Sequence, residues 1–395
     1  MSRPPKPTDH QRKLFPDKDI TMTQTIEPPV VEEAVVEEAA APAPAPEPPK
    51  RRAQRVCEWA VGADYKDFPA ETVEFTKALL LKTIAGMIAG SREPAARILT
   101  TYFAEQGGSP EVGLVGAGYR STVENAAYAN ATFAHSSELE DNEMPNFTSA
   151  YWMLPALFPV AEKQTASGKD LITAAIVTWE VASRYSSAGP GEALMSTHIC
   201  PPSWFGPLGV AVGTAKLLKL DAGRTEHALS MAGSWSSGLG QAGCDTHFLE
   251  SGHTAKMGVQ SAFLARLGAT AELGVLDIKN GIYAPLVANG EIDLTKIDAD
   301  LGQAPYRINR ACIKKYSATS SNSWTFSPTP GSESGTADAA QGQGRGHHRR
   351  RVGCRAGHHP AFPRRGGQGG VRGCPPGLAG GNGRTGRGWP KWFGC

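Results

Sequence analysis

Apolar residues recur at intervals of three and four through the middle of the chain, which is the spacing of one face of an α-helix. In residues 71–90, one such face collects Val73, Leu80, Ile84, Met87 and Ile88. Similar patterns predict helices over 95–105, 119–134, 154–165, 170–185, 205–220, 224–233 and 253–267. Strand-like alternation is scarce before about Ile278. The pattern therefore predicts a mostly α fold, with small residues at many helix contacts.

The pattern also divides the chain into four parts. Residues 1–55 are rich in Pro, Ala and Glu and hold too little bulky apolar surface to fold, so they are expected to form a disordered arm. Residues 56–275 form the large all-helical domain. Short segments around the isolated Pro305 indicate that a small α/β lid domain, truncated in this chain, begins over 276–325. The remaining residues, 326–395, are expected to be disordered.

The tail beyond residue 330 has an unusual composition. It holds no Ile or Tyr and a single Leu, Leu378, so it cannot build a core. Such a sequence is typical of a GC-rich coding region read out of frame. Its histidines and cysteines lack the fixed spacing of a metal site, and no metal site is expected in His347, His348, Cys354, His358, His359 and Cys374.

Composition and charge exclude several classes of function. The 395 residues carry 40 Lys and Arg against 38 Asp and Glu, a formal net charge of +2, which gives no argument for nucleic acid or a membrane surface as partner. No apolar run approaches the roughly 20 residues that span a bilayer. The 7 cysteines show no CxxC spacing and include Cys57, Cys200, Cys244 and Cys312. They indicate unpaired thiols of a reducing compartment, so the expected location is cytoplasmic, with mitochondrial as the alternative.

The most unusual stretch is residues 125–155, NAAYANATFAHSSELEDNEMPNFTSAYWMLP. A helix of small residues leads into Glu138, Glu140, Asp141, Asn142 and Glu143, and Pro145 ends it. A packed helix that runs into clustered carboxylates suits acid–base chemistry. The alternative is an acidic, solvated helix end, which composition alone favours.

Several segments in order resemble the MmgE/PrpD family, which includes 2-methylcitrate dehydratase and cis-aconitate decarboxylase. They are DFPAETVEFTKALLLKTIAGMIAG, ANATFAHSSELED, FGPLGVAVGTAKLLKLD, SGHTAKMGVQSAFLARLGATA and LGQAPYRINRACIKKYSA. The resemblance covers about residues 56–318. It implies a large helical domain, a smaller α/β lid, a homodimer, and a lyase without metal or other cofactor. The implied substrate is a citrate-like tricarboxylate.

The resemblance also implies site residues. His135 aligns with the first His of the family's acidic motif, and Thr148 stands where the family has an active-site His. His247 falls on or beside the family's Lys, and His198 is the candidate for a second His, at a spacing two residues off. The expected catalytic residues are His198, His247 and Asp141, and the expected substrate-binding residues are Glu138, Asn142, Thr148 and Lys256.

Each of these residues has a structural alternative. His198 is equally well explained as a hydrogen-bonded loop residue, and Lys256 as a cation on a helix surface. His253 is expected to cap the helix that follows it, and His135 to be a satisfied polar residue at a helix end.

The preferred function is dehydration of 2-methylcitrate or a longer alkylcitrate by a carbon–oxygen lyase. The alternatives are an itaconate-forming cis-aconitate decarboxylase and a non-catalytic dimeric homologue. The residues cannot separate dehydration from decarboxylation, because both reactions need the same tricarboxylate pocket.

Overall fold

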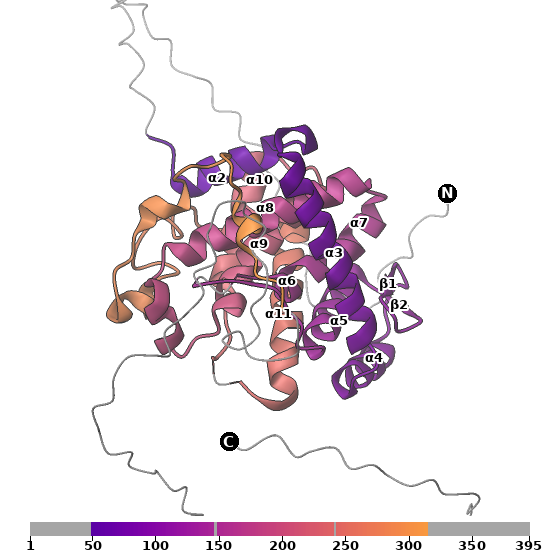
Figure 1. Ribbon diagram of the computed structural model, residues 1–395. Coiled ribbons are helices and arrows are strands. Elements are labelled where there is room, and N and C mark those ends of the chain that lie inside the picture. Colours follow the sequence, from indigo (N-terminus) through magenta and orange to yellow (C-terminus); the bar gives the residue numbers. More distant parts are fainter. Residues whose placement is uncertain (1–48, 146–147, 241, 315–395) are drawn as a thin grey trace, which may run out of the picture. The chain divides into compact units, whose positions relative to one another are not determined.

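The computed structural model describes residues 49–145, 148–240 and 242–314 (Figure 1). Of the predicted disordered arm, residues 1–55, the part up to residue 48 lies outside this range, as does the predicted disordered tail, residues 326–395. The arm was drawn too long, because residues 52–55 belong to a helix that begins at Arg52. The described residues belong to one compact unit. The predicted mostly α fold is confirmed, since helices make up the body of this unit. They are α2 (Arg52–Gly62), α3 (Ala70–Gly90), α4 (Pro94–Gln106), α5 (Val123–Ser136), α6 (Ala150–Met153), α7 (Leu157–Gln164), α8 (Gly168–Ser187), α9 (Pro201–Leu217), α10 (Ala222–Ser234) and α11 (Cys244–Arg266).

Several helices begin or end where the local chemistry predicts. Thr122 caps α5 by accepting a hydrogen bond from the Asn125 amide, and Asp221 caps α10 in the same way. Ser167 and Asp170 form a capping box at the start of α8. On α3 the predicted apolar face is buried at Val73, Leu80 and Met87, whereas Ile84 is half-buried and Ile88, near the end, is 47% exposed. The helical period of the apolar residues therefore predicted these helices well, and their starts follow from side-chain caps.

Two expectations about secondary structure were wrong. Residues 119–121 are not helical: β2 (Tyr119–Ser121) pairs antiparallel with β1 (Val112–Leu114). A second short hairpin, β3 (Asn142–Glu143) with β4 (Thr148–Ser149), follows α5. Helix α11 begins at Cys244 and not at His253, so His253 lies inside the helix and caps nothing. This earlier start places His247 in the first turn of α11.

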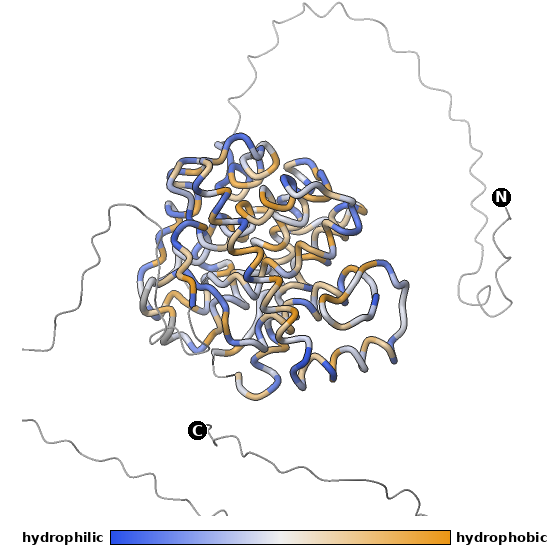
Figure 2. Tube along the Cα trace, turned by 45° about the vertical axis from the view of Figure 1, so that its right-hand side comes forward, coloured by the Kyte–Doolittle hydropathy of each residue, from blue (hydrophilic) through white to orange (hydrophobic). Residues whose placement is uncertain are grey.

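Helix α9 lies at the centre of the helical body, beside α8, α10 and α11 (Figure 1). Glycines permit these close approaches. A Cβ atom on Gly209 would collide with the backbone of Thr178 in α8, and one on Gly258 of α11 would meet Val210. Hydrophobic residues concentrate along the inner segments of the trace and hydrophilic ones along its periphery (Figure 2). None of the described helices has the length and apolar character needed to cross a bilayer.

The chain after α11 packs against the helical body through short 3-10 turns, η4 (Ala284–Asn289), η5 (Leu294–Ile297) and η6 (Arg307–Arg310). Arg184 of α8 donates to the carbonyl of Asp300 at 3.1 Å and also to that of Ala299. Further on, Cys312 forms an isolated antiparallel bridge with Asn142. This return of the chain brings residues 312–314 against the acidic segment. A separate α/β lid stays a prediction.

Candidate active site

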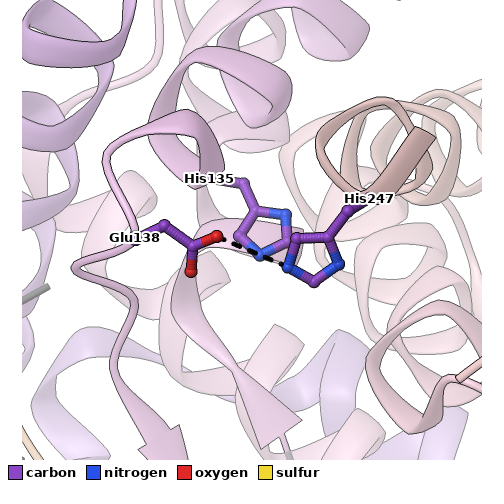
Figure 3. A group of neighbouring side chains, drawn as sticks. All are labelled: His135, Glu138 and His247. Carbon is purple, nitrogen blue, oxygen red and sulfur yellow. Dashed lines mark ion pairs between the residues drawn. The ribbon is translucent and has the colours of Figure 1, made fainter. Parts of the chain in front are cut away.

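Three side chains from separate segments converge beside the acidic segment (Figure 3). His135 lies in the last turn of α5, Glu138 in the turn that follows, and His247 in the first turn of α11. Nε2 of His247 lies 3.6 Å from Oε1 of Glu138, and the rings of His135 and His247 are 4.5 Å apart. One ligand atom from each residue lies within 4.8 Å of the other two. We call these three residues the His–Glu–His cluster.

The backbone around the cluster is held in an uncommon conformation. Glu138 has φ 56° and Cys244, which opens α11, has φ 54°, both in the left-handed region that non-glycine residues rarely adopt. Each such residue costs roughly 1 kcal/mol or more, and residues of this kind gather at functional sites. The left-handed backbone at Glu138 therefore reduces stability, and in this conformation its carboxyl group faces α11.

The ring of His135 is buried among aromatic side chains. His135 is 2% exposed, and its ring centroid lies 4.8 Å from that of Trp152 and 5.6 Å from that of Phe248. Its Nδ1 is buried without a hydrogen-bond partner among the described residues. The expectation of a satisfied polar residue at a helix end is therefore not met for this atom.

Burial is the main cause of the pKa shifts in the His–Glu–His cluster. It raises the pKa of Glu138 to about 7, with a further push from the Glu140 carboxylate. It lowers the pKa of His247 and holds the pKa of His135 well below its ordinary value. The imidazoles are therefore mainly neutral at pH 7, while Glu138 exchanges its proton near that pH. The 3.6 Å contact is too long for a hydrogen bond and is not a permanent ion pair.

Two lysines neutralise Glu140 and Asp141 in the acidic segment. Lys82 of α3 forms an ion pair with Asp141 and donates to the carbonyl of Leu139 at 2.7 Å. Lys314 forms an ion pair with Glu140, and its backbone amide donates to Asp141 at 3.3 Å. Burial raises the pKa of Asp141 to about 6, against the opposing effect of Lys82. Asp141 is therefore an anchor between α3 and the returning chain.

The β3–β4 hairpin holds two of the predicted substrate-binding residues, and both are buried. The amide of Asn142 donates to the Cys312 carbonyl at 3.3 Å, and the Cys312 amide returns a 2.8 Å bond. Thr148 pairs with Glu143 across the hairpin, and its hydroxyl has no partner among the residues that the structure describes. Beside it, Oε2 of Glu143 accepts a 3.0 Å bond from the Trp179 indole.

The structure does not bring His198 and Lys256 into the His–Glu–His cluster. His198 is exposed in a loop, where its carbonyl accepts from the Gly240 amide at 2.9 Å. In the described part of the chain, no partner is found for its ring. Lys256 lies further along α11 than His247, at a rise of about 1.5 Å per residue. Burial raises the pKa of Glu124 at the start of α5, and the charge of Lys256 partly opposes this effect. A hollow of about 650 Å³ is lined in part by Ser167 and Lys216. Neither His198, nor Lys256, nor any residue of the His–Glu–His cluster lines this hollow.

Sequence reasoning missed the two lysines of the site. Lys82 lies among the apolar residues of α3, where a lysine on a long helix is normally a surface residue. Lys314 lies in the segment predicted to begin a lid. The usable signal is the excess of acidic residues: Glu138, Glu140 and Asp141 lie close together without a Lys or Arg beside them, and such carboxylates, if buried, require cations from elsewhere in the chain.

The model described as the MmgE/PrpD N-terminal domain matches residues 54–295. The chain belongs to the MmgE/PrpD family. A cis-aconitate decarboxylase from Aspergillus terreus is 31% identical over 246 residues, which is 60% of this chain and 50% of that protein. A cis-aconitate decarboxylase-like protein, oryM, from Aspergillus oryzae is 30% identical over 251 residues, 60% and 51% of the two chains.

The human cis-aconitate decarboxylase is 33% identical over 164 residues, which is 40% of this chain and 34% of that protein. The MmgE/PrpD chain therefore spans about half the length of the Aspergillus relatives it matches. These relatives carry the names of lyases, and the His–Glu–His cluster lies inside the matched range.

Proposed function

We propose that the site acts as a lyase on a citrate-type tricarboxylate and that its reaction is a decarboxylation of the cis-aconitate type. One observation carries the proposal: the Glu138 carboxyl group faces the ring of His247 in a partly buried turn, with Lys82 and Lys314 in the same segment. The names of the relatives support decarboxylation over the dehydration preferred from the sequence.

Decarboxylation breaks the bond between a carbon atom and its carboxylate group. The electron pair of that bond stays on the carbon, carbon dioxide leaves, and a proton must then reach the carbon. Glu138 suits the role of donor, because burial raises its pKa to about 7 and so keeps part of the population protonated at neutral pH. His247 accepts or returns that proton as a neutral base with a lowered pKa.

The reaction also requires positive charge near the carboxylate groups of the substrate. Lys82 and Lys314 are the cations of the segment, and each is already paired with a carboxylate. Lys82 keeps 22% of its side chain exposed, so it can shift toward a substrate carboxylate without unfolding the turn. The substrate would then compete with Asp141 for this lysine.

Two other functions remain as alternatives. Dehydration of 2-methylcitrate or a longer alkylcitrate expels a hydroxyl group and needs the same acid and base. The second alternative is a non-catalytic dimeric homologue, which would bind a tricarboxylate and leave it unchanged. The homodimer itself is also a proposal, taken from the resemblance to the family.

The test is to incubate the purified full chain with cis-aconitate and, separately, with 2-methylcitrate. We expect release of carbon dioxide and one new dicarboxylate product from cis-aconitate, followed by proton NMR. Glu138→Gln should abolish this release, whereas Glu74→Gln, on the exposed face of α3, should not change it. Water loss from 2-methylcitrate alone would favour the dehydratase, and binding without turnover of either acid would favour the non-catalytic homologue.

A further inference from the structure

We propose that Glu143 is a positioning residue of the site: held to α8 by Trp179, it fastens the returning chain at Arg310 and so sets the place of Lys314 beside the acidic segment. The inference rests on the proposed function, because that function uses Lys314 as one of two cations near the substrate. Glu143 lies outside the His–Glu–His cluster and was not among the site residues expected from the sequence.

On one side, Glu143 is joined to a long buried helix. It is 1% exposed in β3, and its Oε2 accepts a 3.0 Å hydrogen bond from the indole of Trp179. Trp179 is fully buried in α8, a helix of 20 residues. The β3 strand has two residues and forms few hydrogen bonds of its own with β4. The indole therefore joins the hairpin to the helical body through a side chain.

On its other side, Glu143 faces the returning chain. Its Oε1 lies 3.8 Å from the guanidinium of Arg310 at the end of η6. Arg307, in the same turn, adds a second positive charge, and Ser183 of α8 adds a hydrogen bond. Burial raises the pKa of Glu143, whereas the two hydrogen bonds and the two arginines oppose this effect. These four neighbours favour the anion, which attracts the η6 turn.

Lys314 comes shortly after η6, and the chain between them is docked on β3. Asn142 and Cys312 exchange backbone hydrogen bonds of 3.3 and 2.8 Å in an isolated antiparallel bridge. Beyond this bridge, the Lys314 amide donates to Asp141 at 3.3 Å, and the Lys314 ammonium pairs with Glu140. The place of this ammonium therefore depends on how the segment before it is held.

The two ends of η6 are held by different carboxylates. Glu180 accepts from the Arg307 amide at the start of the turn, and Glu143 faces Arg310 at its end. The end is the part that leads into the bridge. Removing the charge of Glu143 would therefore let the bridged segment shift and displace the Lys314 ammonium. A displaced cation lowers the affinity for the substrate more than the rate of proton transfer, so the expected result is a raised KM.

The experiment is a double-mutant cycle on the purified full chain with Glu143→Gln and Arg310→Met. Gln keeps an oxygen that accepts from the Trp179 indole, and Arg310 is 53% exposed, so both variants are expected to fold. Each should raise the KM for cis-aconitate at least about threefold, with a smaller change in kcat, and the double variant should show no further increase. The matched control is Arg224→Met, because Arg224 is 55% exposed and pairs with Asp221 on another helix. It should leave KM unchanged.

An unchanged KM in the two variants would overturn the proposal. Increases that multiply in the double variant would overturn it as well, because Glu143 and Arg310 would then act separately.

A readout without substrate separates this proposal from the proposed function. Hydrogen–deuterium exchange measures the protection of residues 308–314, which include the hydrogen-bonded amide of Lys314. Glu143→Gln and Arg310→Met should each speed exchange in this segment, and Arg224→Met should not. Unchanged exchange in both variants would overturn the positioning role at any level of turnover. Faster exchange in a chain that leaves cis-aconitate intact would keep the hold of Glu143 on Lys314 and overturn the proposed decarboxylation alone.

Discussion

Nε2 of His247 lies 3.6 Å from Oε1 of Glu138, which joins the first turn of α11 to the turn that ends α5. The two helices pack along their length, and Ser251 of α11 donates to the carbonyl of Ala131 in α5 at 3.1 Å. The packing of α5 against α11 thus brings the turn that holds Glu138 beside His247. Substitutions at either residue should change chemistry more than stability.

The first prediction concerns the activity of the His–Glu–His cluster. His247→Ala should lower kcat/KM for cis-aconitate by about 10²–10⁴-fold, the range for removing one general acid or base. The matched control is His253→Ala, an exposed residue on the same helix. Steady-state kinetics of carbon dioxide release make the comparison. Equal losses in both variants would point to a general effect on α11 and count against a chemical role for His247.

Helix existence was the part of the fold that the sequence predicted best. Helices α3 and α8 are long, and their apolar positions recur through several turns. The start of α11 was missed because Cys244–Gly252 contains small and polar residues with little apolar periodicity. The hairpins were missed for a different reason: strands of two or three residues are too short for alternation to be visible.

The site was predictable only in part. The resemblance pointed to the acidic segment and to His247, and the structure brings Glu138 and His247 together. Spacing along the chain cannot show that Lys82 and Lys314 reach this segment, because their partners are distant in sequence. His198 was chosen from a sequence match that was two residues off, and its side chain has no contact with the cluster among the described residues.

The second prediction concerns pH and Asp141. Burial raises the pKa of this carboxyl group to about 6 from an ordinary 3.8. A raised pKa means that the folded chain binds the proton more tightly than the unfolded chain does. The contribution of Asp141 to stability is therefore present below pH 4 and is lost as pH rises through 6. A shift of this size corresponds to about 2–3 kcal/mol.

Asp141→Asn removes this titration. The free energy of unfolding of the variant, minus that of the unaltered chain, should increase by about 2 kcal/mol between pH 4 and pH 6.5. Lys82 loses its partner in the variant, but its partial exposure lets water solvate it. Urea unfolding at several pH values measures the difference. A difference that stays constant with pH would contradict the raised pKa.

The third prediction concerns the contact between α8 and α9. Gly209→Ala adds a Cβ atom that collides with the backbone of Thr178 and with the side chain of Ala182. Backbone atoms cannot rotate away, so the helices must separate, at an expected cost of about 1–3 kcal/mol or more. The control is Gly168→Ala, because a Cβ at that position in the first turn of α8 meets nothing within 4 Å. Thermal unfolding should show a lower Tm for the Gly209 variant only.

The fourth prediction concerns Glu180, which holds the returning chain to α8. Glu180 is 1% exposed, accepts from the Arg184 guanidinium at 3.2 Å and also accepts from the Arg307 amide. Arg184 is itself buried and donates to the carbonyls of Ala299 and Asp300. Glu180→Met would therefore leave a buried guanidinium without its counter-ion, at an expected cost of about 3–5 kcal/mol.

A second variant separates charge from packing. Glu180→Met combined with Arg184→Met removes both charges, so the double variant should be less destabilised than the sum of the two single variants by about 0.5–3 kcal/mol. Limited proteolysis should also cut residues 298–310 faster in Glu180→Met, since this segment loses its anchor. Additive free energies with unchanged proteolysis would mean that the η6 turn is held by other contacts, such as that of Arg307 with Ser187 at 2.8 Å.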